Sequence, residues 1–549
     1  LKRLFGVTKE DRTITRNDFY ISPDEKYQEI TGRELYIEAI FSFPELAGDI
    51  QSARGLCPAF SSVIYADKED GVLKARMRLE ALWDEKEYED EVPSKIYWVT
   101  TSEEIEFGEG EDFKFSVSAH DRKNIRLRYI PAFRDSKAML RNEVKALTKI
   151  LEEYTFIESS HQERIEKISK NLSDEIQSLE AIKTTTRLIK NIWSKTHDNT
   201  LKHYQEPILE ATPNEIKELL SAISINLSPS EDGGSRDISE LSDGQVSLLY
   251  FTLAIALYDI EQKHSADKAK GFKVLDKDIP VFTIFAFEEP ENHLSPYYLG
   301  RVLKVLSSKS STSKATAIVT SHSPSVVRRI EKVEQIRHFR QEISSTSRHS
   351  VVRKILMPPK KSEDDYKYIN QAVLAHPELY FSKFVMLGEG DSEEIVISQL
   401  AEKLGFDVDP SFVAFVKLGG RHVNHMWRLL SDLDIPFLTL IDLDLGRKNA
   451  GQCRIEYAIS ELKKIGENFI FPPKTNAKDL NESYIDLVQI QKLLAELEKY
   501  GVYFSFPLDL DMSMIVAFPD CYRASNAQKS DRESFSHPCH RTRDCRSGH

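Results

Sequence analysis

Two adjacent glutamates, Glu288 and Glu289, follow the apolar or nearly apolar run Val281 to Phe287. The run contains β-branched and aromatic residues, which predicts a strand buried on both faces, as in a parallel sheet. Open α/β sheets place their ligands at the carboxyl ends of such strands. One carboxylate there can hold Mg²⁺, usually through water, while the other orients an attacking water. The alternative interpretation is a strand that ends in a solvated acidic turn.

A second pair of carboxylates, Glu389 and Glu393, follows the short apolar run Phe384 to Leu387. The run predicts a buried strand that ends at Glu389, and Glu393 falls in the first turn of the helix that comes next. We expect Gly390 to let the chain turn tightly between them. Both carboxylates can then point into one site.

A third acidic pair, Asp442 and Asp444, ends the predicted strand Phe437 to Ile441. Residues i and i+2 of a strand face the same side, so these carboxylates should converge. Between the two acidic strand ends, Phe412 to Lys417 predicts another strand. Clustered carboxylates suit Mg²⁺ or Mn²⁺, and two such ions ~4 Å apart clamp the attacking and leaving oxygens of a phosphodiester. The alternative is that these acids solvate a sheet edge.

The segment Ser242-Asp243-Gly244-Gln245 opens an apolar helix that runs to about Ile260. Such a helix start leaves backbone N–H groups and a positive dipole end available to an anion. Downstream, a buried strand through Ala317 to Thr320 is followed by Ser321 and His322.

The rest of the chain supplies the elements that must position these residues. From residue 33 to about 132, apolar and polar residues alternate, which predicts half-buried antiparallel strands; Ala75, Met77, Leu79, Ala81 and Trp83 share one face, with Lys74, Arg76, Arg78 and Glu80 on the other. From 136 to about 225 the spacing becomes helical, with an apolar stripe at Ile165, Ile168, Leu172, Ile176 and Leu179. This stripe either packs on the same chain or forms a dimer contact.

Length and composition favour a protein of two or three globular domains. The chain has 549 residues, of which 40% are hydrophobic and 29% charged. No apolar run reaches the ~18 residues of a membrane span. The five cysteines show no paired spacing, which favours a reducing cytoplasm over a disulfide framework. The net charge of −13 does not exclude a nuclease, since phosphate can bind to a local basic surface.

Both ends of the sequence are unusual. The chain starts at Leu1 with LKRLFG, which is typical of a helix already under way. Residues 524–549 have almost no apolar periodicity, and we expect an atypical, unstructured tail. The alternative there is a metal site formed by Cys539, His540, Cys545 and His549.

Three motifs together resemble the ABC-type ATPase heads: LSDGQ as the signature loop, FEEPENHLSP as the Walker B strand and TSHSP as the switch histidine. The resemblance implies ATP as a ligand. It implies that Glu288 binds Mg²⁺, that Glu289 positions the hydrolytic water and that His322 senses the γ-phosphate. It also implies that Ser242, Asp243, Gly244 and Gln245 cap the nucleotide of a neighbouring head.

The order strand-EGxxE-helix, strand-GG, strand-DxD resembles the Toprim fold. An ABC head with a helical insert followed by Toprim resembles the OLD (overcoming lysogenisation defect) family of ATP-dependent endonucleases, a group that includes the Gabija nuclease subunit; YIPAFRD and HPELYFSKFVMLGEGDSEE match its style. The resemblance implies metal ligands on a later strand as well, at Ser505, Asp509 or Asp511. Which of the two aspartates binds metal stays open. The metal ligands that the resemblance implies are then Glu389, Glu393, Asp442, Asp444, Asp509 and Asp511. The catalytic residues that it implies are Glu389, Asp442 and Asp444 of the Toprim motifs, and Glu289 and His322 of the ATPase motifs.

Two departures from the family pattern matter. No GxxxxGK[ST] phosphate loop occurs in this sequence, so we expect amino-terminal truncation and poor ATP binding. The family's nuclease uses a lysine after its last acid, and only Lys529 stands there.

The predicted fold is α/β: an ABC-type ATPase head with a β-rich subdomain and an inserted helical dimerisation region, then a carboxyl-terminal Toprim domain. The expected boundaries are 1–135 and 228–335 for the two parts of the head, 136–227 for the helical insert, 336–380 for a linker, 381–523 for Toprim and 524–549 for the tail.

The predicted function is an ATP-regulated, Mg²⁺- or Mn²⁺-dependent DNA endonuclease of antiphage defence. We expect the protein to be cytoplasmic, without membrane contact, and a homodimer or higher oligomer. A helicase-like protein is a candidate partner. The alternatives are a RecF-like repair ATPase that does not cut DNA, and a non-catalytic scaffold.

Overall fold

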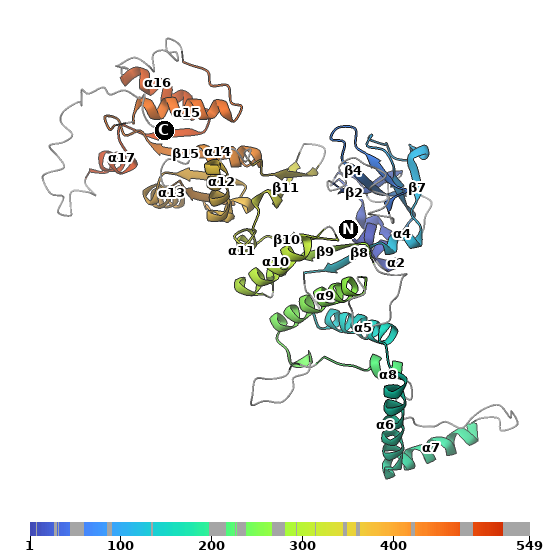
Figure 1. Cartoon of the computed structure of the whole chain (residues 1–549). Coiled ribbons are helices and arrows are strands. Elements are labelled where there is room, and N and C mark those ends of the chain that lie inside the picture. Colours follow the sequence, from blue (N-terminus) through green and yellow to red (C-terminus); the bar gives the residue numbers. More distant parts are fainter. Residues whose placement is uncertain are drawn as a thin grey trace. The chain divides into compact units, whose positions relative to one another are not determined.

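The computed structural model describes residues 1–6, 8–22, 24–26, 30, 32–43, 60–84, 91–132, 136–196, 216–225, 227, 238–265, 280–292, 294–312, 314–343, 348–357, 363–418, 423–448, 450–472 and 487–519. The chain divides into two compact units, Leu1–Ser321 and His322–His549. The first unit carries the predicted signature segment and the Walker B glutamates, and the second begins at His322 and carries the predicted Toprim motifs (Figure 1).

A three-stranded parallel sheet forms the centre of the first unit, in the order β10, β9, β8. Its strands are β8 (Ile125–Ile130), β9 (Phe282–Glu288) and β10 (Ala315–Thr320). Successive residues of β9 pack into two different core clusters: Ile284 and Ala286 into one, Phe285 and Phe287 into the other. The buried parallel strand that the sequence predicts is therefore confirmed, with Glu288 at its carboxyl end.

The second sheet of the first unit is antiparallel, in the order β2, β4, β6, β7, with β3 beside β4. Its strands are β2 (Arg33–Phe43), β3 (Ile64–Ala66), β4 (Leu73–Trp83), β6 (Ser94–Val99) and β7 (Lys114–Ser116).

Both faces of β4 are buried, so the prediction of a half-buried strand is wrong here. The apolar face is covered as expected, but Arg76, Arg78 and Glu80 on the other face are only 5%, 1% and 8% exposed. Both arginines donate to Oε1 of Glu38 on β2. They also donate to backbone carbonyls of the segment after β6; Ile105, for example, accepts from Arg78 at 2.9 Å. These bonds pair both buried guanidinium groups with acceptors, although Nε and Nη2 of Arg78 have no hydrogen-bond partner among the described residues.

Helices fill the expected insert: α5 (Ser136–Tyr154), α6 (Ser159–Ser178), α7 (Glu180–Thr196) and α8 (Ile216–Ser221), followed by α9 (Asp243–Ser265), which packs against α5 (Figure 1). The apolar stripe of α6 is largely exposed, with Ile168 at 67% and Leu172 at 52%, whereas Ser169 and Ser173 are buried. Within the described part of the chain, little covers this stripe.

The second unit is built on a four-stranded parallel sheet in the order β14, β13, β15, β16. Its strands are β13 (Phe384–Gly388), β14 (Val413–Lys417), β15 (Phe437–Asp442) and β16 (Val502–Ser505). Its helices include α13 (Asp391–Lys403), α14 (Val423–Asp432), α15 (Gln452–Lys464), α16 (Leu487–Glu498) and α17 (Leu510–Ala517). Trp427 is fully buried in the core and donates from Nε1 to Oγ1 of Thr439 at 2.7 Å.

The segment that we expected to be an irregular linker, residues 336–380, is largely ordered. It contains the antiparallel pair β11 (Arg337–Ile343) and β12 (Arg348–Lys354), and then α12 (Glu363–Ala375). Ile355, Val373 and Leu379 belong to the core of the second unit. The polar composition that suggested a linker belongs to the exposed positions of the two strands.

The remaining helices and strands are α1 (Lys2–Phe5), α2 (Lys9–Arg12), β1 (Ile14–Thr15), β5 (Glu91–Val92), α4 (Ala119–Lys123), α10 (Pro296–Ser310) and α11 (Pro324–Val327). Among the described helices none has the length and apolar character needed to cross a membrane. Cys453 on α15 is disulfide-bonded, which the cysteine spacing did not predict. The tail 524–549, with its candidate Cys/His site, lies outside the described residues.

Candidate active sites

Glu288, at the end of β9, is held by a tyrosine of the neighbouring strand β8. The hydroxyl of Tyr129 donates a hydrogen bond to Oε2 of Glu288. The register pairs Tyr129 with Ala286, so the ring reaches two residues along β9. Burial, and then the bond to Glu288, raise the pKa of Tyr129, which keeps the phenol protonated as a donor. In the sequence Tyr129 marks only the start of a family motif, and sequence alone gives it no role.

Glu289 turns the chain away from the sheet. Its φ of 45° is left-handed, which is uncommon outside glycine and concentrates at functional sites. Its N–H donates to the carbonyl of Thr320 at 2.9 Å, and Asn292 donates from Nδ2 to its Oε2 at 3.0 Å. The carboxylate is therefore oriented by an amide at the end of β9. His322 follows the end of β10 by two residues and is exposed.

The signature segment forms a self-capped helix start. Ser242 precedes α9, and its N–H and hydroxyl both lie 3.2 Å from Oε1 of Gln245. The Gln245 N–H points back to Oγ of Ser242 at 3.4 Å. This is the reciprocal arrangement of a capping box. Ser242, Asp243 and Gln245 are exposed, so the motif is on the surface of the first unit.

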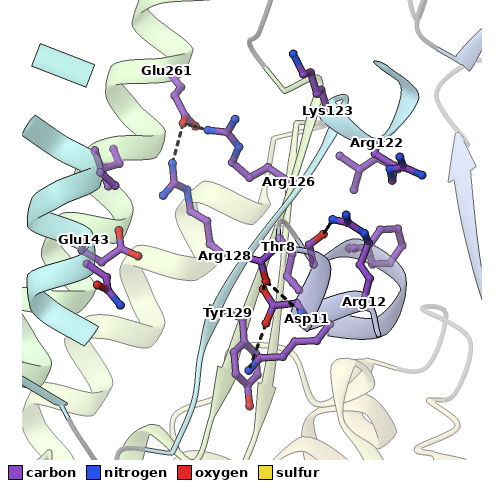
Figure 2. Close-up of a pocket in the computed structure, with 18 of the residues that line it drawn as sticks. Thr8, Asp11, Arg12, Arg122, Lys123, Arg126, Arg128, Tyr129, Glu143 and Glu261 are labelled. Atoms are coloured by element: carbon purple, nitrogen blue, oxygen red, sulfur yellow. Dashed lines mark hydrogen bonds and ion pairs between the residues drawn. The ribbon is translucent and has the colours of Figure 1, made fainter. Parts of the chain in front are cut away.

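A cavity of about 1140 Å³ lies beside β8, between α1, α2 and α4 on one side and α5 and α9 on the other (Figure 2). Its wall is rich in basic side chains, but Glu261 of α9 accepts from both Arg126 and Arg128 of β8. The ring of Tyr129 lies at the same wall, with Nζ of Lys2 4.1 Å from its centroid. The cavity therefore borders the residue that holds Glu288.

In the second unit, Glu389 and Glu393 are brought together by a close approach of α13 to β13. The close approach occurs at Gly388, where a Cβ would lie 2.4 Å from the Phe415 ring and 2.8 Å from Cβ of Glu393. Gly390 has an extended backbone (φ −154°), and a Cβ there would meet only Oε2 of Glu393, at an ordinary contact distance of 3.7 Å, so its expected role as the turn glycine is wrong. Its N–H donates to Oε2 of Glu393 at 2.6 Å and holds that buried carboxylate in place.

Asp442 ends β15, and the N–H of Asp442 donates to Oε2 of Glu389 at 2.9 Å. Its own Oδ1 accepts from the N–H of Leu510 at 3.1 Å. Burial, and then the charges of Glu389 and Glu393, raise the pKa of Asp442 to about 6. Burial and the neighbouring carboxylates thus both favour the protonated form of Asp442.

Asp444 does not continue the strand, so the expectation that two residues of one strand converge by alternation is wrong for this pair. Its φ is 53°, in the left-handed region, and its N–H donates to the carbonyl of Leu508 at 2.8 Å. A turn held by the segment after β16, rather than strand periodicity, places the Asp444 carboxylate.

Two arginines that sequence reasoning missed complete this group. Arg454, in the first turn of α15, places Nη1 2.9 Å from Oε2 of Glu389 and 2.5 Å from the carbonyl of Asp442. Its Nη2 lies 2.7 Å from Oδ2 of Asp444. Arg447 binds the other oxygen of Asp444 and lies 3.4 Å from Oδ2 of Asp509. No sequence signal marked them beyond two basic residues soon after the DxD motif.

The late strand brings Ser505 and Asp509 to the same sheet edge. Ser505 pairs with Asp442 in register, and its Oγ is buried without a hydrogen-bond partner. Asp509 caps α17, accepting from the N–H of Met512 at 2.9 Å, and shares Arg447 with Asp444. Asp511 is exposed. The geometry therefore favours Asp509 over Asp511 as the late acid.

The donor set suits a hard divalent cation, because all of its members are oxygens and the buried Oγ of Ser505 lacks a partner. The arrangement is not yet that of a metal centre. Among the described residues, no three His, Cys, Asp or Glu side chains are grouped closely enough to hold a metal ion. The guanidinium of Arg454 stands between Glu389 and Asp444 instead.

Comparison with protein families finds two matches along the chain. Residues 380–444 match the Toprim domain of overcoming lysogenization defect protein-like proteins. Residues 90–328 match an AAA domain family whose description names the AbiEii toxin of a type IV toxin–antitoxin system. No curated protein sequence matches the chain.

Among solved structures, the chain is similar to carboxyl-terminal regions of OLD proteins. The region from Xanthomonas campestris pv. campestris shares 19% identity at a TM-score of 0.20, covering 29% of this chain and 69% of that one. The region from Burkholderia pseudomallei shares 17% identity at a TM-score of 0.20, covering 28% of this chain and 72% of that one.

The predicted α/β architecture is confirmed, with an ATPase domain followed by a Toprim region. The first match spans Glu389, Glu393, Asp442 and Asp444, and the second spans the signature segment, Glu288 and His322. The chain therefore carries an AAA-type ATPase domain followed by an OLD-like Toprim domain.

Proposed function

We propose that the protein is a divalent-metal-dependent DNA endonuclease, regulated by ATP, that serves in antiphage defence in the cytoplasm. The observation that carries the nuclease assignment is one guanidinium at the carboxyl edge of the Toprim sheet, which pairs with the carboxylates of Glu389 and Asp444 and with the backbone carbonyl of Asp442. Two carboxylates that share one cation mark a place where positive charge is favoured. An OLD-like Toprim domain supports a nuclease, and the AAA-type domain supports nucleotide use.

Glu389, Asp442 and Asp444 are the residues that would hold Mg²⁺ or Mn²⁺, with Glu393 and Asp509 beside them. Bound metal would neutralise charge developing on the phosphodiester and favour the ionised form of an attacking water. The protein's own hydrogen bonds fix two of these ligands: Leu510 orients Asp442, and Gly390 orients Glu393.

In the ATPase domain, the proposed roles follow the order of the motifs. Glu288 would bind the Mg²⁺ of ATP, and Glu289 would position the hydrolytic water. His322 would sense the γ-phosphate. The exposed cap Ser242 to Gln245 would meet the nucleotide of a neighbouring head, which requires at least a homodimer. Tyr129 holds Glu288 and so belongs to this group as a positioning residue.

The exposed stripe of α6 supports self-association. Leu172→Asp should lower the molar mass measured by light scattering, because it places a charge in an apolar contact. Lys170→Asp, on the opposite side of the same helix, is the matched control and should leave the mass unchanged. A variant Leu172→Asp with unchanged mass would remove α6 from the proposed interface.

The function is tested with supercoiled plasmid DNA incubated with the protein in Mg²⁺, Mn²⁺ or EDTA. Nicked or linear product that forms only with metal supports the endonuclease. DNA-stimulated ATP turnover without strand breaks would instead support a RecF-like repair ATPase, and neither activity would support a scaffold. A helicase-like partner protein is proposed on the family resemblance and is tested by co-purification with the DNA-bound protein.

A further inference from the structure

We propose that Arg454 is a resident cation of the Toprim site, which fills the gap between Glu389 and Asp444 in the metal-free protein and must leave it when a divalent cation binds. The proposal deepens the nuclease assignment and rests on it for the identity of the metal. It makes metal loading a competition between the protein's own guanidinium and the dissolved ion.

The contacts show that Arg454 takes the oxygens that a metal would need. Nη1 lies 3.3 Å and 2.9 Å from the two carboxylate oxygens of Glu389, and Nη2 lies 2.7 Å from Oδ2 of Asp444. The same Nη1 lies 2.5 Å from the carbonyl oxygen of Asp442. A planar guanidinium with several fixed donors can bridge carboxylates in this way, and it is charged at every accessible pH.

Burial makes this a site interaction rather than a surface ion pair. The side chain of Asp444 is 8% exposed, and those of Arg454 and Glu389 are 28% and 27% exposed. Partly desolvated charges interact more strongly than exposed ones, which contribute little. Arg447 differs on both counts: its side chain is 59% exposed, and it binds the outer oxygen of Asp444.

Arg454 also explains why the acidic side chains of this site are not grouped as metal ligands. In the described part of the chain, no three acidic, histidine or cysteine side chains are grouped to hold an ion, although the carboxylates of Glu389 and Asp444 and the backbone carbonyl of Asp442 share one guanidinium. A divalent ion placed among them would lie next to the positive charge of Arg454, which is unfavourable. Arg454 must therefore move outward as the metal enters.

The displaced guanidinium has a chemical use. It remains attached to the first turn of α15, beside the carboxylates, and guanidinium groups pair well with phosphate oxygens. The side chain would then contact the DNA backbone next to the metal ligands. This gives the site a basic group within the described residues, where the sequence analysis found only Lys529 in the tail.

The test measures Mn²⁺ affinity without DNA, by electron paramagnetic resonance of free Mn²⁺ or by calorimetry, in Arg454→Met and in the control Lys464→Met, which removes a positive charge from the other end of α15, where Lys464 pairs with Glu461. We expect Arg454→Met to bind Mn²⁺ at least about tenfold more tightly, a change of about 1.4 kcal/mol, because the competing charge is gone. Lys464→Met should change the affinity less than about threefold. Equal or weaker binding in Arg454→Met would overturn the proposal, since it would make Arg454 a strut that positions the ligands.

Thermal unfolding supplies a second readout that does not depend on cleavage. In EDTA, Arg454→Met should unfold at a lower temperature than the unaltered protein, and Mn²⁺ should raise its unfolding temperature by more. If Arg454→Met does not fold, Arg454→Gln removes the charge but keeps an amide donor, and it has to show the same direction in both measurements. Unaltered protein that binds Mn²⁺ but leaves DNA intact would refute the nuclease function and leave the Arg454 comparison valid. Absence of Mn²⁺ binding in every variant would overturn both.

Discussion

At the end of β9, Glu288 accepts a hydrogen bond from the phenol of Tyr129, and Glu289 accepts one from the amide of Asn292. At the ends of β13 and β15, by contrast, Glu389 and Asp444 share the charged guanidinium of Arg454. Both sites place carboxylates at the carboxyl edge of a parallel sheet. They differ in whether the groups that hold the carboxylates carry a charge.

Neutral donors orient a carboxylate and leave its full negative charge available to a cation. A charged donor orients it and also neutralises it, so that an incoming cation has to compete. Glu288 therefore keeps the negative charge that a cation would need, whereas Glu389 and Asp444 are already compensated by Arg454. The following experiments would sharpen or break this contrast.

The largest expected effect separates the two chemistries. In a protein that also carries a phosphate loop, Asp442→Ala should abolish plasmid cleavage and spare ATP turnover, because losing metal-ion stabilisation costs several kcal/mol of the barrier and each ~1.4 kcal/mol is a factor of ten in rate. Glu289→Gln in the same protein should abolish ATP turnover. Asp511→Ala, an exposed acid on α17, is the control and should cleave normally. Cleavage that persists in Asp442→Ala at saturating Mn²⁺ would end the nuclease assignment.

The next effect concerns how each strand end is packed. Gly388→Ala should lower the free energy of unfolding by about 1 to 3 kcal/mol, because its Cβ would lie 2.4 Å from the Phe415 ring. Gly390→Ala, two residues away, should change it by less than about 1 kcal/mol. Urea unfolding of both variants measures the difference. Equal losses would mean that the close approach at Gly388 does not decide the packing.

Tyr129→Phe tests the neutral side of the comparison. It removes the hydroxyl that holds Glu288 and should lower the free energy of unfolding by about 1 kcal/mol, the usual contribution of one hydrogen bond. Tyr297→Phe, at a tyrosine that is 84% exposed, should have no measurable effect. The decrease in the free energy of unfolding caused by Tyr129→Phe should be the same in Mg²⁺ and in EDTA. The decrease caused by Arg454→Met should depend on whether metal is present. A metal-dependent loss at Tyr129 would break the contrast.

The smallest effect is a pH dependence in metal-free protein. The pKa of Asp442 is raised from its ordinary value of 3.8 to about 6, so the fold favours the protonated form. The stability from this group is present below about pH 4 and is lost as pH rises through about 6. In EDTA at pH 8, Asp442→Asn should therefore be more stable than the unaltered protein, by about 1 kcal/mol once solvent screening of this partly exposed group is allowed for. At pH 4 the two should be equal in thermal unfolding, and an advantage of the same size at both pH values would contradict this account.

The strand ends could be predicted from sequence because buried parallel strands are continuous apolar runs. That pattern placed Glu288, Glu389 and Asp442 at sheet edges within one residue of their observed positions. The roles of Arg454 and Tyr129 could not be predicted in this way. Their side chains reach the sites across the fold, from α15 and from β8, and nothing in local periodicity reports such a contact.

Local conformation was also hard to predict. Asp444 follows the strand by two residues, and alternation predicted the direction of its side chain only if the strand continued. The chain instead makes a left-handed turn at Asp444, and the carbonyl of the distant Leu508 holds that turn. The sequence predicted a tight turn at Gly390 because this glycine lies between Glu389 and Glu393. The position where only a glycine fits is instead Gly388, since a Cβ there would clash with the Phe415 ring. On β4, alternation separated the two faces correctly but could not show that the segment around Ile105 covers the charged one.

The charged face of β4 has a consequence for how the antiparallel sheet assembles. Met77 and Leu79 pack in an aromatic-rich core, and Arg76 and Arg78 bond to Glu38 and to backbone carbonyls on the other side. A slip of one residue in strand pairing would exchange the two faces and force the guanidinium groups among apolar rings without acceptors. The buried ions thus penalise misaligned pairing far more than a polar, solvated face would. They select a single alignment of β2, β4 and β6.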